Sequence, residues 1–576
     1  MKKNDCENAM NCMTLIAGKN ASATGYVLVA HNEDDSGRNV VRHAYVKPAD
    51  WPEGAFLDAE EGRAKIPQAR HTLGYAWTQV RGETRGYSSA DLFLNEKGVC
   101  VVSNSAGASR ETGTDEALLK DGGLEYNLRR IVAERAESAK DGFERMISLV
   151  NEWGYASPGR IYTVADANEA YMLQLVRGKR WIGARVPDDA VVVMPNHYTF
   201  HGLNDVPGTV FSQDLVGYAL QNGWYVPAVP GDFSDFDFAS AYQEPRGYRI
   251  EENVLRQKFG LETVLKRPWD VKSEGLPFCV RTERKVTLED AFCFLSAHYD
   301  GTAYDLRFGP GMSPHATSVR RICTMSTNEA VVYDLRPEPI LTTAWTAFGR
   351  PCELPFVPLH PLAGYPAEID RMEDAAKERA NHLKSVPRPV GYRESGWQKT
   401  RDFENLLEAN YLRCACEFQK QKQRLFERQR AENERLTQSS DLSKGVWENA
   451  NRAFAREALA LTEAFSARYF SSSRITDFPV LSLSSHAPVC VAFVCPGEPD
   501  EASLSLVMGG MNARSEAVFA RKGSLKAAEN GQYTAIFPSP LDAAPVAHAD
   551  RYDFILGGRN QSGEPFGAMT VASVEP

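Results

Sequence analysis

The segment Asn11-Cys12-Met13-Thr14-Leu15-Ile16-Ala17-Gly18-Lys19 decides how the first part of the chain is interpreted. It joins a polar leader to an apolar run of strand length, and Cys12 stands at the junction. A self-cleaving hydrolase needs its nucleophile at such a strand start, because the freed α-amine can then act as general base for its own side chain. An α-amine has a pKa of about 7.7 to 8, which suits proton transfer near neutral pH. The segment therefore nominates Cys12 as a nucleophile, although a cysteine that enters a strand is more often a packing residue.

Further strand-length runs follow over the first 350 residues, each bounded by Gly, Asn, Asp or Pro. Helical spacing of apolar residues appears between them, over 124–139 and 142–153. Paired strands followed by paired helices predict a layered α+β architecture. The predicted strands are 14–17, 26–30, 99–103, 161–165, 171–176, 191–194 and 330–335.

The composition of the chain changes twice toward the C-terminus. Residues 401–436 and 446–470 are rich in charged residues with apolar residues three to four apart, which predicts an antiparallel helical hairpin. From 478 onward, apolar and polar residues alternate between Pro and Gly turns, which predicts a small β-sandwich. We therefore expect a propeptide (1–11), a hydrolase core (12–375), a helical hairpin region packed on the core (376–475) and an accessory β domain (477–576).

Composition excludes several classes of function. The chain has 576 residues, 43% of them hydrophobic, and a net charge of −10, which gives no general attraction to nucleic acid or anionic lipid. The N-terminus lacks an apolar signal region and no stretch is long enough to span a bilayer, so we expect a cytoplasmic protein without membrane contact. Eleven cysteines, an odd number, argue against a disulfide framework. Cys414-Ala-Cys416 alone cannot form a four-ligand zinc site, and we expect no metal and no cofactor.

A series of motifs in this chain resembles the dipeptidase A family of cysteine peptidases. The resemblance covers about the first 470 residues, in order. It implies a four-layer αββα sandwich of the N-terminal-nucleophile hydrolase type, autocatalytic removal of the leader, and dipeptides or short peptides as substrates. The matching segments are Cys12-Met-Thr-Leu-Ile-Ala-Gly-Lys, 25–35, Asn95-Glu-Lys-Gly-Val, 122–130, 165–170, 181–189, Met194-Pro-Asn196, 299–305, 320–324 and Arg336-Pro.

The wider superfamily, which includes choloylglycine hydrolases and penicillin V acylases, implies roles for further residues. Asp34 would anchor the freed amine of Cys12, and His31 stands where other members carry Arg. Imidazole carries a charge only when protonated, so the role of His31 stays open. Asn196 matches an oxyanion-hole amide, an effect worth about 3 kcal/mol per donor. Asn104 would add a backbone N–H donor, and Arg320 resembles a late active-site arginine.

Structural interpretations compete with these roles. Asp34 and Asn196 also fit turns, and Arg320 also fits a surface cation. Cys6 lies in the acidic leader without the strand that follows Cys12, so we do not expect it to be the nucleophile. Three histidines lack metal-ligand spacing to carboxylates and are interpreted as hydrogen-bonded polar residues: His197, His201 and His298.

Three functions are compatible with the sequence. The first is a cysteine dipeptidase acting through an acyl-enzyme on Cys12. The second is an amidase of N-acyl non-peptide substrates, which shares the catalytic residues and differs in its pocket. The third is a non-catalytic, secernin-like binding protein, against which the joint presence of Cys12, Asn32, Asp34 and Asn196 argues. The substrate side chains and the formation of homo-oligomers stay open.

Overall fold

The computed structural model describes thirteen stretches of the chain. The predicted propeptide, with Cys6, lies outside them, as does the segment 370–394, in which the expected boundary between core and hairpin falls. Within the described stretches, no helix is both long and apolar enough to cross a membrane. The described residues are 12–35, 38–57, 62–82, 88–307, 313–316, 319–369, 395–439, 441–470, 472–509, 516–528, 530–544, 546 and 550–576.

The segment after Cys12 forms an inner strand of a seven-stranded sheet. Strand β1 (Met13–Ala17) pairs antiparallel with β2 (Leu28–Asp34) on one side and β12 (Ala190–Met194) on the other. The sheet continues beyond β2 through β15, β16 and β17 and ends beyond β12 with β14. The bounds of these four strands are β14 (Val280–Arg281), β15 (Thr327–Asp334), β16 (Thr343–Ala347) and β17 (Val357–Leu359).

A second sheet has eight strands in the order β13-β11-β10-β9-β8-β7-β6-β3. Its longest strand, β9, runs from Tyr155 to Ala165 and pairs with β8 and β10. The other strands are β3 (Asn39–Val46), β6 (Tyr75–Gly82), β7 (Ser88–Asn95), β8 (Cys100–Ser105), β10 (Ala170–Gly178), β11 (Trp181–Arg185) and β13 (Val210–Phe211). The short strands β4 (Ala49–Asp50) and β5 (His71–Thr72) form a separate pair.

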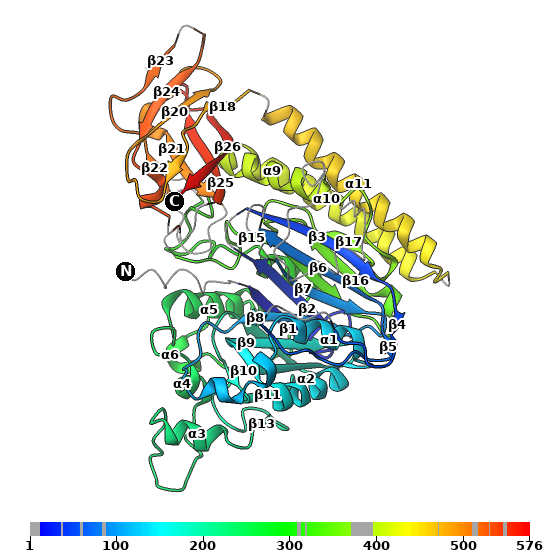
Figure 1. Ribbon diagram of the computed structural model, residues 1–576. Coiled ribbons are helices and arrows are strands. Elements are labelled where there is room, and N and C mark those ends of the chain that lie inside the picture. Colours follow the sequence, from blue (N-terminus) through cyan, green and yellow to red (C-terminus); the bar gives the residue numbers. More distant parts are fainter. Residues whose placement is uncertain are drawn as a thin grey trace.

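Alternation along the strands sends apolar side chains to both faces of each sheet. One core lies between the two sheets, where residues such as Ile16 and Met194 meet Val102 and Met172. Leu15, which directly precedes Ile16 in β1, points to the other face and belongs to a different core. Helices therefore cover the outer faces of both sheets (Figure 1).

Helices α1 (Asn127–Arg135) and α2 (Ala139–Trp153) pack on the second sheet through residues such as Ile131 and Met146. Helices α5 (Glu251–Leu265) and α7 (Leu288–Leu295) pack on the first sheet. The helix expected over 124–139 is present but shorter, since α1 ends at Arg135 and Ser138 caps α2 by accepting the Asp141 N–H. Shorter helices are α3 (Leu215–Gln221), α4 (Phe238–Tyr242) and α6 (Val271–Glu274).

The expected helical hairpin is present with one difference. Helices α10 (Tyr411–Thr437) and α11 (Lys444–Tyr469) lie side by side along one side of the molecule (Figure 1), joined by a hydrogen bond from Gln429 Nε2 to Phe454 O of 3.0 Å. The first arm is broken, because α9 (Gly396–Ala409) ends at Asn410 and α10 begins anew. The Asn410 side chain donates to Leu406 O at 2.8 Å. Asparagine favours such local bonds over continuation of a helix.

The C-terminal residues form two further sheets around a core of their own, which includes Val491, Leu506 and Phe554. This β module lies against the N-terminal part of the molecule and against α9, since Asp553 is buried in ion pairs with Arg38 and with Arg401 on α9. The strands are β18 (Arg474–Asp477), β20 (Val489–Val494), β24 (Tyr533–Phe537) and β23 (Lys526–Ala527) in one sheet, and β19 (Leu481–Ser482), β26 (Pro565–Glu575), β25 (Asp550–Arg559), β21 (Ser505–Gly509) and β22 (Val518–Phe519) in the other.

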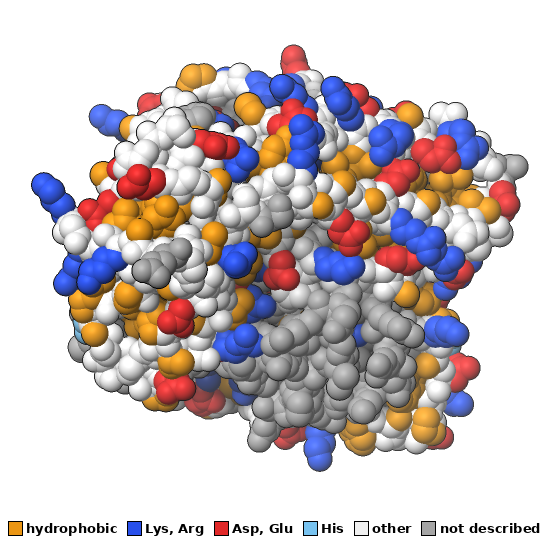
Figure 2. Space-filling view, turned by 90° about the horizontal axis from the view of Figure 1, so that it is seen from above, with side chains coloured by type: hydrophobic (Ala, Val, Ile, Leu, Met, Phe, Trp, Pro, Cys, Tyr) orange, Lys and Arg blue, Asp and Glu red, His pale blue; other side chains and the backbone are white. Residues whose placement is uncertain are grey.

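The structure confirms the mixed helix and sheet class expected from the sequence. On the face shown in Figure 2, basic and acidic side chains are interspersed among the described residues. This mixture accords with the modest net charge of the chain.

Candidate active site

Cys12 lies at the start of β1 and is 2% exposed. Its thiol donates to Glu33 Oε2 at 3.9 Å. Burial, together with the negative charges of Glu33 and Asp34, raises the pKa of the Cys12 thiol well above its usual value. The thiol therefore stays protonated in this arrangement, and a nearby base or positive charge is needed to activate it.

The pairing of β1 with β2 places the other predicted residues. Met13 lies opposite Asn32, so side chains of β2 alternate between the two faces of the sheet. His31 and Glu33 point to the face that Cys12 and Thr14 share, whereas Asn32 points to the opposite face and donates to Leu295 O and Ile322 O at 2.9 and 3.0 Å. Asn32 thus ties β2 to the segment that follows α7.

His31 lies in a chain of hydrogen bonds behind the thiol. The Thr14 hydroxyl donates to Asn104 Oδ1 at 2.6 Å, so the 2.8 Å contact between Thr14 Oγ1 and His31 Nδ1 assigns the donated proton to Nδ1. The other ring nitrogen, Nε2, lies 3.4 Å from Glu33 Oε2. Glu33 Oε2 is therefore approached by both Cys12 and His31.

Asp34 is buried at the end of β2. Neither oxygen of its carboxyl group has a hydrogen bond of normal geometry within the described residues. Burial raises the pKa of Asp34 to about 7, and the Thr327 hydroxyl and the charge of Arg256 oppose this shift. A further positive charge close to Asp34 would therefore lower the pKa of this carboxyl group toward its usual value.

Asn104, on β8 of the second sheet, clamps the two sheets together beside the nucleophile. Its side-chain Nδ2 donates to Cys12 O at 2.9 Å and to Met194 O at 3.1 Å. Both amide hydrogens have carbonyl partners, so the side chain holds the start of β1 in place. The donor expected from Asn104 was its backbone N–H, but this group faces β9, where Asn104 pairs with Ile161.

Asn196 follows β12 and lies in a firmly held position. Its Nδ2 donates to Ser105 O at 2.8 Å, and its Oδ1 accepts from Arg256 Nη2 at 2.6 Å. Arg256 Nη2 also donates to Asn253 Oδ1. An amide nitrogen carries two hydrogens, so Asn196 keeps one for a further acceptor.

Arginines from two segments approach this site. Arg256, on α5, is fully buried; burial lowers its pKa, and Tyr299 and Asp34 partly offset this shift. Arg320, which precedes β15, is 9% exposed, and burial together with the charge of Arg256 lowers its pKa to about 9, opposed in part by Glu252 and Asp34. Both guanidinium groups lie within electrostatic reach of Asp34.

Glu33 and Arg256 lie at the site but were not predicted from the sequence. Glu33 could have been found from alternation, because it stands two residues from His31 on the same strand face. Arg256 lies in a helix of ordinary composition, and no motif marks it.

A cavity of about 590 Å³ opens elsewhere, between α5, α7 and α10. Its lining includes Phe259, His298 and Cys352 but none of the six predicted site residues. The candidate active site therefore rests on the contacts around Cys12 and not on this cavity.

Comparisons with known proteins point to one family. The profile of peptidase family C69 matches residues 11–382. A probable dipeptidase of Latilactobacillus sakei is 25% identical over 353 residues, which are 60% of this chain and 73% of that protein. A dipeptidase of Bifidobacterium longum (strain NCC 2705) is 28% identical over 397 residues, 61% of this chain and 71% of its own.

A longer match extends to probable dipeptidase B of Lactococcus lactis subsp. lactis (strain IL1403), 24% identical over 440 residues and covering 75% of this chain and 91% of that protein. Among solved structures, a mutant of a conjugated bile acid hydrolase from Clostridium perfringens matches with a TM-score of 0.27 and 11% identity, covering 59% of this chain and 89% of that one. The assignment therefore rests on the sequence matches, and the profile match starts at Asn11, directly before Cys12. The chain belongs to peptidase family C69, a family of peptide hydrolases.

Proposed function

We propose that the protein is an autoprocessed cysteine dipeptidase with Cys12 as its nucleophile and the freed Cys12 α-amine as its general base. The observation that carries this proposal is the position of Cys12 beside Asp34. The Cys12 thiol lies at the start of β1, and the Asp34 carboxyl group is buried without a hydrogen bond of normal geometry among the described residues. An ammonium group at Cys12 would lie beside that carboxylate and stabilise its charged form.

Maturation begins with attack of the Cys12 thiol on the Asn11 carbonyl. The sulfur forms a bond to that carbon, the Asn11–Cys12 C–N bond breaks, and the nitrogen takes up a proton to become the α-amine. Water then hydrolyses the thioester, which releases residues 1–11 and restores the thiol.

Peptide hydrolysis uses the same groups. The α-amine takes the thiol proton, and the thiolate attacks the scissile carbonyl. The second amide hydrogen of Asn196 donates to the oxyanion, and a backbone N–H near Cys12 is the other donor. The α-ammonium then protonates the leaving amine, and water hydrolyses the acyl-enzyme.

Arg256 has a positioning role in this scheme. Its Nη2 donates to Asn196 Oδ1 at 2.6 Å, and this hydrogen bond fixes the orientation of the amide and the direction of its N–H groups. Its permanent charge near Cys12 and Asp34 also provides what the superfamily obtains from an arginine at the position of His31. His31 then acts as a hydrogen-bond donor to Thr14.

We also infer the helix–sheet–sheet–helix layering of N-terminal-nucleophile hydrolases for residues 12–369. The support is the division of apolar residues into one core between the sheets and one core under the helices on each outer face. The helices α9 to α11 and the β module are additions to that plan.

Dipeptides are the proposed substrates because the relatives named above are called dipeptidases. The test compares unmodified dipeptides with the same dipeptides acylated at the amine and with N-acyl amides that contain no peptide. We expect hydrolysis of free dipeptides and none by Cys12→Ala, whereas Cys490→Ser, at an exposed thiol of the β module, should keep full activity.

Two outcomes would contradict the proposal. Cleavage of N-acyl amides alone would make the protein an amidase. An uncleaved N-terminus together with no hydrolysis of any substrate would indicate a binding protein that keeps the fold.

A further inference from the structure

Four buried side chains outside the active site converge on one point. His298 follows α7, His315 lies in the segment 313–316, Cys323 precedes β15 and Cys352 follows β16. All four are buried, and one ligand atom from each lies within 4.8 Å of the others. Two imidazoles and two thiols are the ligand set of a structural zinc site.

The distances between these atoms fit a tetrahedral ion. His315 Nε2 lies 3.0 Å from His298 Nε2, 3.5 Å from Cys323 Sγ and 3.4 Å from Cys352 Sγ. The two sulfurs are 3.5 Å apart. Zinc bonds of about 2.3 Å to sulfur and 2.0 to 2.1 Å to nitrogen predict about 3.8 Å between sulfurs, about 3.5 Å between sulfur and nitrogen, and about 3.3 Å between nitrogens.

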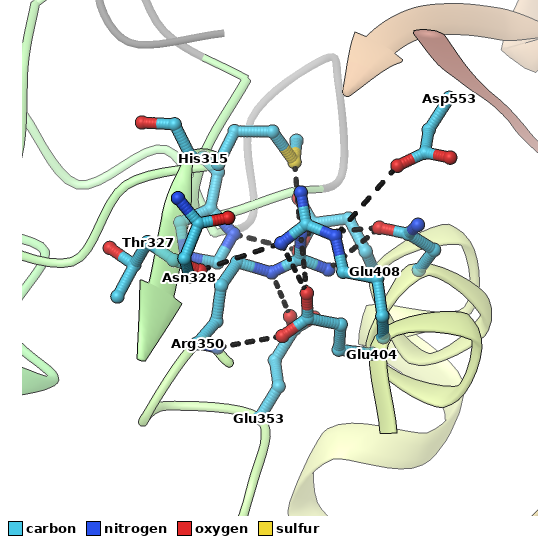
Figure 3. A network of polar contacts seen from close by, with 12 residues as sticks. His315, Thr327, Asn328, Arg350, Glu353, Glu404, Glu408 and Asp553 are labelled. Atoms are coloured by element: carbon cyan, nitrogen blue, oxygen red, sulfur yellow. Dashed lines mark hydrogen bonds and ion pairs between the residues drawn. The ribbon is translucent and has the colours of Figure 1, made fainter. Parts of the chain in front are cut away.

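A carboxylate behind one histidine completes the arrangement. Glu408, on α9, lies with Oε2 at 2.8 Å from His315 Nδ1, which puts the proton on Nδ1 and leaves the Nε2 lone pair directed at the cluster. Carboxylates commonly orient zinc-bound histidines in this way. Figure 3 shows His315 and Glu408 beside Arg350 and Glu353, within a network of buried polar groups.

Charge also favours a divalent ion at this place. Two thiolates and two neutral imidazoles around Zn²⁺ form a group with no net charge, which can be buried at little cost. Zinc is favoured over harder ions because thiolate and imidazole are soft or intermediate ligands in tetrahedral array. His298 and Cys352 also line the 590 Å³ cavity, which gives an ion a path to the cluster.

We propose that His298, His315, Cys323 and Cys352 bind one Zn²⁺ in a closed structural site. This differs from the sequence-based expectation of no metal, because three ligands come from the long connection between α7 and β15 and the fourth from the loop after β16, without a recognisable spacing. Between α7 and β15 the described residues contain neither helix nor strand, and this segment carries Arg320. The ion fastens that segment to the loop after β16 and to α9, and so holds Arg320 near Asp34.

The test measures zinc in the purified full-length protein, prepared without chelators. We expect about one zinc per chain by elemental mass spectrometry, in the parent protein and also in Cys12→Ala. Because Cys12→Ala is inactive under the proposed function, its zinc content keeps the two proposals separate. Cys323→Ser and Cys352→Ser should each lose most of the zinc, whereas Cys414→Ser, a buried thiol outside the cluster, should retain it.

Further measurements keep the proposal testable if the cysteine variants fail to fold. Replacement of zinc by Co²⁺ in the parent protein should give the visible absorption and thiolate charge-transfer bands of a tetrahedral two-sulfur, two-nitrogen site. Glu408→Gln should weaken zinc binding by about 10- to 100-fold without abolishing it. A parent protein with much less than one zinc per chain and no Co²⁺ bands, or with Cys323 and Cys352 joined in a disulfide by peptide mapping, would overturn the proposal.

Discussion

Replacement of Asp34 by Asn tests whether this carboxyl group is held ready for a cation. The variant is made in a Cys12→Ala background, which under the proposed mechanism keeps its leader and has no free amine at position 12. Burial raises the pKa of Asp34 from 3.8 to about 7, so the folded state binds a proton more tightly than the unfolded state. The stability provided by this group is complete below about pH 4 and falls as the pH rises toward 7.

The size of the effect follows from the shift. A difference of about three pKa units corresponds to about 4 kcal/mol of unfolding free energy above pH 7, as an upper bound. Asn has the shape of the protonated acid and carries no charge. Asp34→Asn should therefore stabilise the Cys12→Ala protein at pH 8 by up to about 4 kcal/mol and change it little at pH 4.

The assay is thermal melting of both proteins at several values between pH 4 and pH 8.5. The difference between their melting temperatures isolates Asp34 from other groups that titrate in this range. We expect a difference of several degrees at pH 8 that shrinks toward zero at pH 4. A difference that does not vary with pH would refute the reasoning.

Three further predictions concern residues around the site and the β module. Arg256→Gln should lower kcat by at least about tenfold while changing KM less, because Asn196 loses its orientation, and Arg256→Lys should recover part of the loss; equal kcat for all three proteins would argue against this role. Asp553→Ala should destabilise the protein by about 3 to 5 kcal/mol in thermal or urea unfolding, because buried Arg38 loses this carboxylate and Arg401 is left with Glu404 as its ion-pair partner among the described residues; an unchanged melting temperature would show that the contact is dispensable. His31→Asn should keep kcat/KM within about tenfold and leave the shape of its pH profile unchanged, since Asn can donate to Thr14, whereas loss of the alkaline limb only in the parent would indicate a charge role for His31.

The sequence predicts the strands that build the site because their signal is local. The β-branched runs at 14–17 and 191–194 form β1 and β12, with Gly18 and Pro195 just beyond their ends. The motif after β1 likewise places His31 and Asp34 on the adjacent strand. Local propensity and alternation therefore suffice for the middle of the first sheet.

Residues that reach the site through tertiary packing could not be predicted in this way. Arg256 approaches Asn196 only because α5 packs on the first sheet, and nothing in the helix itself indicates this contact. The four residues of the proposed zinc site come from loops, where no periodicity relates one ligand to the next. The break at Asn410 was missed because the apolar spacing continues across it.

The β module combines a feature that the sequence predicts with one that it does not. Its alternation predicts a separate core, which the structure contains. The buried ion pairs of Asp553 join residues far apart in the sequence, so composition could not indicate how closely the module and the rest of the chain are connected.

The central claim is that Cys12 becomes the N-terminal residue by its own chemistry. Intact-mass measurement of the parent protein and of Cys12→Ala, expressed and purified in parallel, tests it most directly. The account predicts that the parent protein has lost residues 1–11 and begins at Cys12, and that Cys12→Ala keeps them. A fully active parent protein that retains residues before Cys12, or a Cys12→Ala protein cleaved at the same bond, would contradict the account.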